Sequence, residues 1–120
     1  MRQPILLLVE DEPLIAQDLQ GELEAEGYLV LVANNATEAL LLCARHLPQM
    51  AILNFNYQNQ VDGMTLARQL RTRYLVKVLF ITGCRPQDVE ASEDFYAGHE
   101  VLYKPFTKRQ LQLYLANFLP

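Results

Sequence analysis

The sequence predicts an α/β fold, in which five parallel strands alternate with helices that cover both faces of one sheet. The first observation is a set of short, mostly apolar runs that end abruptly at polar residues, as strands buried on both faces do. These runs are Ile5–Val9, Leu29–Ala33, Met50–Asn54, Val76–Ile81 and Glu100–Tyr103. The second observation is that a stretch of helical length follows each run. That order predicts βαβ units with right-handed crossovers.

The five expected helices are marked by turn and capping residues. Proline is favoured in the first turn of a helix, asparagine and threonine cap helix starts, and glycine ends helices. The first helix should turn one apolar face inward, made of Leu14, Ile15, Leu19 and Leu23. The expected helices are Pro13 to about Glu26, Asn35 to just before Pro48, Gly63 to about Arg73, Pro86 to Tyr96, and the stretch after Thr107.

Length and composition indicate one domain spanning residues 1–120, because 120 residues with 51% hydrophobic content form a single core. A net charge of −4 argues against direct nucleic-acid binding. The two cysteines suit a reducing cytoplasm, and the first apolar run is too short for a signal peptide or membrane span. Cations do gather around one helix end, where they complement the helix dipole: Arg68, Arg71, Arg73 and Lys77.

Every expected strand except the second ends in a polar group of a type that can bind a cation or an anion. In parallel sheets, ligands bind just outside the carboxyl ends of the strands. The first strand is followed by Glu10 and Asp11, while Asn54, Thr82 and Lys104 mark the ends of the third, fourth and fifth. Two carboxylates about 4 Å apart repel by about 4 kcal/mol at an effective dielectric near 20, so such a pair either binds a cation or shifts a pKa. Magnesium is the expected ion.

This pattern resembles the receiver domain of response regulators, and the resemblance runs from Ile5 to Leu119. The matching motifs are Leu-Val-Glu-Asp-Glu-Pro, Ala-Ile-Leu-Asn-Phe-Asn followed by Asp-Gly, Phe-Ile-Thr-Gly and Tyr-Lys-Pro-Phe. The resemblance implies a flavodoxin-like sheet of strand order 2-1-3-4-5, with a cis peptide bond before Pro105. It also implies a signalling module rather than an enzyme.

The resemblance assigns roles to the site residues. Glu10 and Asp11 would bind magnesium, to which Asn56 would offer its backbone carbonyl oxygen. The Thr82 hydroxyl would follow a phosphoryl group, and Lys104 would pair with it. In the family an aspartate at the end of the third strand receives that phosphoryl group from a histidine kinase.

Two positions depart from the family pattern. The phosphoacceptor position holds Asn54, and an amide has no anionic oxygen to attack phosphorus. Val101 stands where many receivers carry a switching aromatic residue. The sequence leaves open a natural pseudo-receiver, an engineered block of a normal site, and partial deamidation to aspartate. The amide also removes one negative charge beside the acid pair, so magnesium binding should be weakened.

The leading functional prediction is a phosphorelay pseudo-receiver that acts through protein contacts. Its partners would be a sensor histidine kinase or an output protein, and a homodimer could form through Pro86–Tyr96, the last strand and the last helix. The alternatives are a conventional receiver carrying an engineered asparagine and, from another class, a flavin- or nucleotide-binding enzyme. The acidic first loop would repel the phosphates of such a cofactor. Since no output domain follows Pro120, we expect a stand-alone adaptor or a fragment.

Overall fold

The computed structural model describes residues 3–54, 60–83 and 100–118, and it shows one sheet of five parallel strands. The strand order is β2-β1-β3-β4-β5, which confirms the predicted order. The strands are β1 (Ile5–Val9), β2 (Leu29–Ala33), β3 (Met50–Asn54), β4 (Lys77–Thr82) and β5 (Glu100–Tyr103). The expected helix at Pro86–Tyr96, Cys84 and the site residue Asn56 lie outside the described residues.

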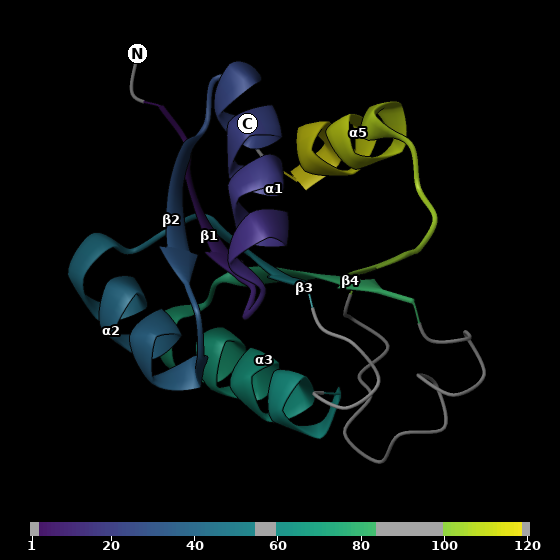
Figure 1. The fold of residues 1–120 in the computed structure, drawn as a ribbon. Coiled ribbons are helices and arrows are strands. Elements are labelled where there is room, and N and C mark those ends of the chain that lie inside the picture. Colours follow the sequence, from purple (N-terminus) through teal and green to yellow (C-terminus); the bar gives the residue numbers. More distant parts are fainter. Residues whose placement is uncertain (1–2, 55–59, 84–99, 119–120) are drawn as a thin grey trace.

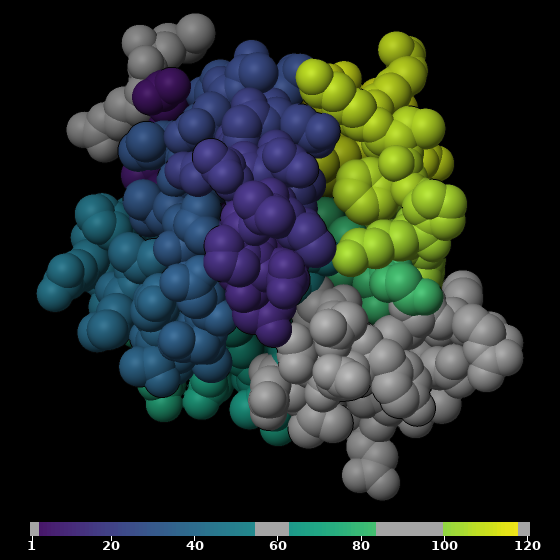
Figure 2. Space-filling model, in the orientation of Figure 1, coloured from purple at the N-terminus to yellow at the C-terminus, as the bar shows by residue number. Residues whose placement is uncertain are grey.

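Helices cover both faces of the sheet (Figure 1). On one face lie α1 (Pro13–Ala25) and α5 (Lys108–Phe118), and on the other lie α2 (Ala36–His46) and α3 (Gln60–Tyr74). In the space-filling view, α1 stands at the centre of the visible face with α5 to its right and α2 to its left (Figure 2). Among the described residues, no helix combines the length and apolar character needed to cross a bilayer.

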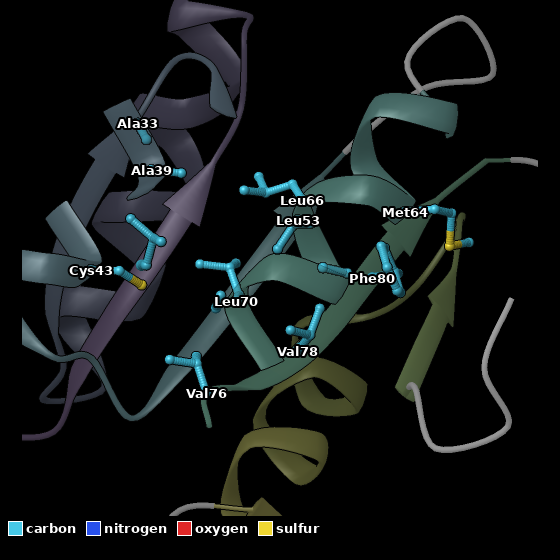
Figure 3. Packing of buried hydrophobic residues seen from close by; sticks show 13 residues of the cluster. Ala33, Ala39, Cys43, Leu53, Met64, Leu66, Leu70, Val76, Val78 and Phe80 are labelled. Carbon is cyan, nitrogen blue, oxygen red and sulfur yellow. The ribbon is translucent and has the colours of Figure 1, made fainter. Parts of the chain in front are cut away.

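The core forms because successive strand residues point to opposite faces of the sheet. In β3 all five residues are buried, with Ala51 and Leu53 in the cluster under α2 and α3, and Met50 and Ile52 in the cluster under α1 and α5. Figure 3 shows the first cluster, in which Leu53 of β3 and Phe80 of β4 share the layer with α3 side chains. The central strand is therefore sealed on both faces.

Local capping fixes the helix ends where the sequence predicts. Pro13 occupies the first turn of α1. Asn35 is the N-cap of α2, and its Oδ1 accepts a hydrogen bond from the Glu38 N–H at 2.9 Å. Thr107 caps α5 in the same way, because its Oγ1 accepts from the Gln110 N–H at 3.1 Å. These bonds satisfy donors that have no partner inside the helix.

The predicted apolar face of α1 is partly wrong. Leu19 and Leu23 are buried together with Ala16, but Leu14 is 73% exposed and Ile15 is 42% exposed. Both lie in the first turn, beside the edge where the strands end, so little of the sheet remains for them to cover.

The predicted start of α3 is wrong by three residues. The helix begins at Gln60 rather than Gly63, so Gly63 lies inside it. The buried side chains that follow, Met64, Ala67 and Leu70, outweigh the helix cost of about 1 kcal/mol for one glycine. Strand β4 is also shifted by one residue, to Lys77–Thr82, which makes Thr82 its last residue.

Candidate functional site

The candidate site lies at the carboxyl edge of the sheet, where parallel strands bring their ends together. A cavity of about 460 Å³ opens there, and both acidic residues that follow β1 line it together with Asn54 at the end of β3. The remaining wall comes from the start of α2 and from α3. The lining residues are Val9, Glu10, Asp11, Asn34, Asn35, Ala36, Thr37, Leu53, Asn54, Gly63, Thr65, Leu66 and Gln69.

Glu10 is a buried carboxylate held by backbone contacts on both sides. Its N–H donates to the Ala33 carbonyl oxygen at 3.0 Å, and its Oε1 accepts from the Glu12 N–H at 2.9 Å. Burial raises the pKa of Glu10 above its usual value, and contact with Asp11 raises it further. The Glu12 N–H and the charge of Lys104 act in the opposite direction on this pKa. The charges of Asp11 and Lys104 therefore both act on the pKa of Glu10.

Asn54 is buried at the end of the central strand, with 5% of its surface exposed. Its Oδ1 atom accepts no hydrogen bond from any described residue. An unsatisfied buried acceptor costs about 1–3 kcal/mol, so a cation or a hydrogen-bond donor in the cavity would be stabilised there. The amide oxygen and the two neighbouring carboxylates all offer electron pairs to such a group.

Thr82 and Lys104 meet at the ends of β4 and β5. Thr82 is fully buried, and its carbonyl oxygen accepts a hydrogen bond from the Lys104 N–H at 2.8 Å. The Lys104 side chain passes over Gly83, where an added Cβ would lie 3.9 Å from Lys104 Cδ. The Lys104–Pro105 peptide bond is cis, as the resemblance implies. The predicted hydroxyl and cation thus belong to the same edge as the acid pair.

The donor atoms at this edge suit a hard divalent cation. Magnesium is held by oxygen atoms, commonly one or two carboxylates supplemented by neutral oxygens and water. Within the described part of the chain, no three histidine, cysteine, aspartate or glutamate side chains gather into a metal cluster. The candidate oxygen ligands are the carboxylates of Glu10 and Asp11, with the neutral amide of Asn54 in the lining of the same cavity. The chemistry of this set fits magnesium, but the set carries one charge fewer than a three-carboxylate site.

Val101 is half-buried and packs against the core cluster under α2 and α3. Its carbonyl oxygen accepts a hydrogen bond from the Tyr114 hydroxyl at 3.5 Å. Tyr103, two residues later, packs against the same cluster and pairs directly with Thr82 in the sheet. The aromatic residue in register with Thr82 is therefore Tyr103, the first residue of the Tyr-Lys-Pro-Phe motif.

The cavity is also lined by residues that the sequence did not mark as site residues. Asn34 and Asn35 directly follow β2 and line the cavity, as do Thr65 and Gln69 of α3. The Asn-Asn pair was a sequence signal, because it stands at a strand end like the other polar groups. Thr65 and Gln69 had no such signal, since their positions depend on how α3 packs beside α2.

Comparison with known proteins gives one consistent result. A family model described as "Response regulator receiver domain" matches residues 6–116. The chain is 32% identical over 120 residues to the aerobic respiration control protein ArcA of Escherichia coli, covering 99% of this chain and 50% of that protein. It is 37% identical over 114 residues to the transcriptional regulatory protein AruR of Pseudomonas aeruginosa, covering 90% and 46%. The chain thus spans about half the length of these curated relatives.

Solved structures agree with the sequence relatives. The signal receiver domain of an HD domain-containing protein from Pseudomonas fluorescens matches with a TM-score of 0.84 and 28% identity, over 98% of this chain and 94% of that one. The response regulator protein TrrA of Thermotoga maritima, solved in complex with Mg(2+)-BeF, matches with a TM-score of 0.83 and 25% identity. That match covers 98% of this chain and all of the other.

Proposed function

The chain belongs to the response regulator receiver domain family of two-component systems, and on that premise we propose that it is a pseudo-receiver. Members of this family are signalling modules rather than enzymes. In the proposed function, the domain receives no phosphoryl group at Asn54. It signals through protein contacts in the fold that the unphosphorylated chain adopts.

The observation that carries this proposal is the neutral, buried Asn54 in an otherwise charged site. Asn54 lines the cavity together with Glu10 and Asp11, and its buried Oδ1 has no hydrogen-bond partner among the described residues. Phosphoryl transfer to a side chain needs a nucleophilic oxygen, and the neutral amide of Asn54 has no anionic oxygen that could attack phosphorus. The side chain at this buried position therefore cannot accept the phosphoryl group that is transferred in the family's reaction.

We assign magnesium to the acidic end of the cavity, with Glu10 and Asp11 as side-chain ligands and Asn56 as a carbonyl ligand. The TrrA structure supports this assignment, because it shares the fold and was solved in complex with Mg(2+)-BeF. A bound ion would supply positive charge that offsets the repulsion between the two carboxylates. The amide at position 54 should weaken its binding, because one anionic ligand is missing.

Thr82 and Lys104 keep their places at the site edge but have no phosphoryl group to contact. In this proposal the Thr82 hydroxyl and the Lys104 ammonium stay in one arrangement, and Val101 takes no part in an aromatic switch. The half-buried Val101 supports this, because it packs against the core.

The proposed partners are a sensor histidine kinase or another phosphorelay or output protein in the cytoplasm. The regulators ArcA and AruR support a role in signalling. A homodimer through β5, α5 and residues 86–96 is part of the proposal, and sedimentation at micromolar concentration tests it. We propose that residues 1–120 form one receiver domain.

The test is phosphorylation of the parent chain and of Asn54→Asp by a small phosphodonor, such as acetyl phosphate, with magnesium present. The variant should gain acid-labile phosphate because it regains an anionic nucleophile, while the parent should gain none. A double variant, Asn54→Asp with Asp11→Asn, serves as the control, since it has the nucleophile but lacks one metal ligand. Phosphate on the parent chain would refute the pseudo-receiver.

A second candidate is a conventional receiver whose aspartate was replaced by design. The residue types favour it, because Glu10, Asp11, Thr82 and Lys104 are those that the resemblance implies for a phosphorylated receiver. The codon for position 54 in the parent gene separates the two: an asparagine codon supports the pseudo-receiver, and an aspartate codon supports the engineered block.

A further inference from the structure

Two exposed leucines lie at the edge of the sheet opposite the candidate site. Leu47 follows α2 and is 68% exposed, and Leu75 follows α3 and is 86% exposed. Helices α2 and α3 pack against each other, and the strands that follow them start as a pair, with Met50 in register with Lys77. The two leucines therefore come to the same end of the α2–α3 layer, where β3 and β4 begin.

Both leucines adopt a backbone conformation that disfavours a side chain. Leu47 has a φ of 48° and Leu75 has a φ of 55°, in the left-handed region that suits glycine. Each N–H still caps its helix, donating to the Cys43 carbonyl oxygen at 3.0 Å and the Arg71 carbonyl oxygen at 3.2 Å. A glycine would make the same caps with less strain. The leucine side chains thus add cost to the fold and bury little surface in return.

Cationic residues lie close to these leucines in the sequence, on a chain whose net charge is −4. Arg45 lies in the last turn of α2, Arg71 and Arg73 lie in the last turn of α3, and Lys77 opens β4. Arg45, Arg73 and Lys77 are exposed, and Arg71 is half-buried. Cations there also complement the two helix C-termini, but that role does not account for the leucines.

We propose that this surface, the basic-apolar edge formed by Leu47, Leu75, Arg45, Arg73 and Lys77, docks an acidic amphipathic segment of a partner protein. The leucines would contact apolar side chains of that segment, and the cations would attract its carboxylates. The edge lies at the opposite end of the strands from Asn54. The inference therefore does not depend on whether the domain is phosphorylated.

Charge and apolar surface together favour a protein segment over other occupants. Leucines gain nothing against the phosphates of a nucleic acid. An anionic membrane is much larger than this edge and would meet the net negative charge of the whole domain, whereas a short acidic segment would meet mainly the nearby cations. A second copy could offer the acidic α1 with its exposed Leu14 and Ile15, but such a head-to-tail contact would have to close into a ring or continue as an open filament.

The experiment titrates the isotope-labelled 120-residue chain with a synthetic helical peptide of about 14 glutamates and leucines, leucines spaced as in an amphipathic helix. We expect saturable amide shifts centred on residues 45–49 and 73–77. The double variant Leu47→Gly/Leu75→Gly should bind about tenfold more weakly, because it removes both apolar contacts. Its thermal midpoint should equal or exceed that of the parent chain, because glycine relieves the strain.

Matched controls separate docking from loss of structure. Leu113→Ala removes a comparably exposed leucine from α5 and should leave peptide affinity unchanged. Arg45→Gln/Arg73→Gln should weaken binding and flatten its salt dependence. A peptide with glutamine in place of every glutamate should bind at least tenfold more weakly.

Four results would overturn the inference. The first is that the peptide shows no saturable binding, and the second is that the double glycine variant binds the peptide as tightly as the parent chain. The third is that the chain binds phosphatidylglycerol vesicles or duplex DNA in place of the peptide, and that the glycine variant weakens this binding. The fourth is that the chain associates with itself and the glycine variant abolishes this association.

Discussion

Replacing Asn54 by aspartate should destabilise the metal-free domain, and magnesium should reverse that loss. The amide lies 5% exposed in a cavity that Glu10 and Asp11 also line. A carboxylate there would add a third negative charge in surroundings that already raise the pKa of Glu10. The perturbation changes charge at almost constant side-chain volume, so packing should be little affected.

The expected size follows from burial and repulsion. One pair of unit charges about 4 Å apart repels by about 4 kcal/mol at an effective dielectric near 20, and wider spacing or partial protonation reduces this. We expect the free energy of unfolding of Asn54→Asp to fall by about 2–4 kcal/mol at neutral pH without metal. For a domain of this size that lowers the thermal midpoint by roughly 8–16 °C.

The assay is thermal and urea unfolding of the parent chain and the variant, first with a chelator and then with increasing magnesium. Magnesium at about 100 times its dissociation constant adds about 2.7 kcal/mol to a chain that binds it only when folded. The variant should gain more from magnesium than the parent chain, because its site has one more anionic ligand. Gln17→Glu, the same amide-to-acid change at an exposed position of α1, should shift the free energy by less than about 0.5 kcal/mol.

Equal stability of Asn54→Asp and the parent chain in chelator would refute the reasoning. It would mean that position 54 does not share an electrostatic environment with Glu10 and Asp11. A loss that magnesium fails to restore would refute the metal assignment and leave the repulsion in place.

Three further predictions concern other parts of the domain. Burial raises the pKa of Glu10 above 4.5, so the native state holds this proton more tightly than the unfolded chain. Without metal, the free energy of unfolding should therefore fall as pH rises from about 4.5 through the native pKa. Urea unfolding of Glu10→Gln should show a weaker dependence on pH, and an unchanged dependence would contradict the burial of the Glu10 carboxyl group. Asn35→Ala should cost about 1 kcal/mol by removing the α2 cap, whereas Asn117→Ala at an exposed site of α5 should cost almost nothing in the same measurement. Phe80→Ala should cost about 3–5 kcal/mol, since Phe80 is fully buried between β4 and α3; a loss below about 1 kcal/mol would argue against the packing in Figure 3.

Local chemistry was enough to predict the strands, their parallel arrangement and most helix ends. Apolar runs that end at polar residues marked the strands, and Pro13, Asn35 and Thr107 capped helices through contacts within a few residues. Strand ends meet at one edge in any parallel sheet. The approach of Glu10, Asp11 and Lys104 was therefore predictable before any coordinates.

The wrong prediction for α1 and the cavity residues that were not predicted both depend on where each helix lies relative to the end of the sheet. Leu14 and Ile15 have the right spacing for a buried face, but their turn lies beside the sheet edge and they stay exposed. Thr65 and Gln69 line the cavity only because α3 packs beside α2.

The chain order of residues specifies which groups stand at strand ends, because side-chain alternation and capping act over a few residues. Whether those groups are buried, and whether they find hydrogen-bond partners, depends on neighbours that are distant in the sequence. The unpartnered Oδ1 of Asn54 and the exposed, strained Leu47 and Leu75 therefore became visible only when the helices were packed on the sheet.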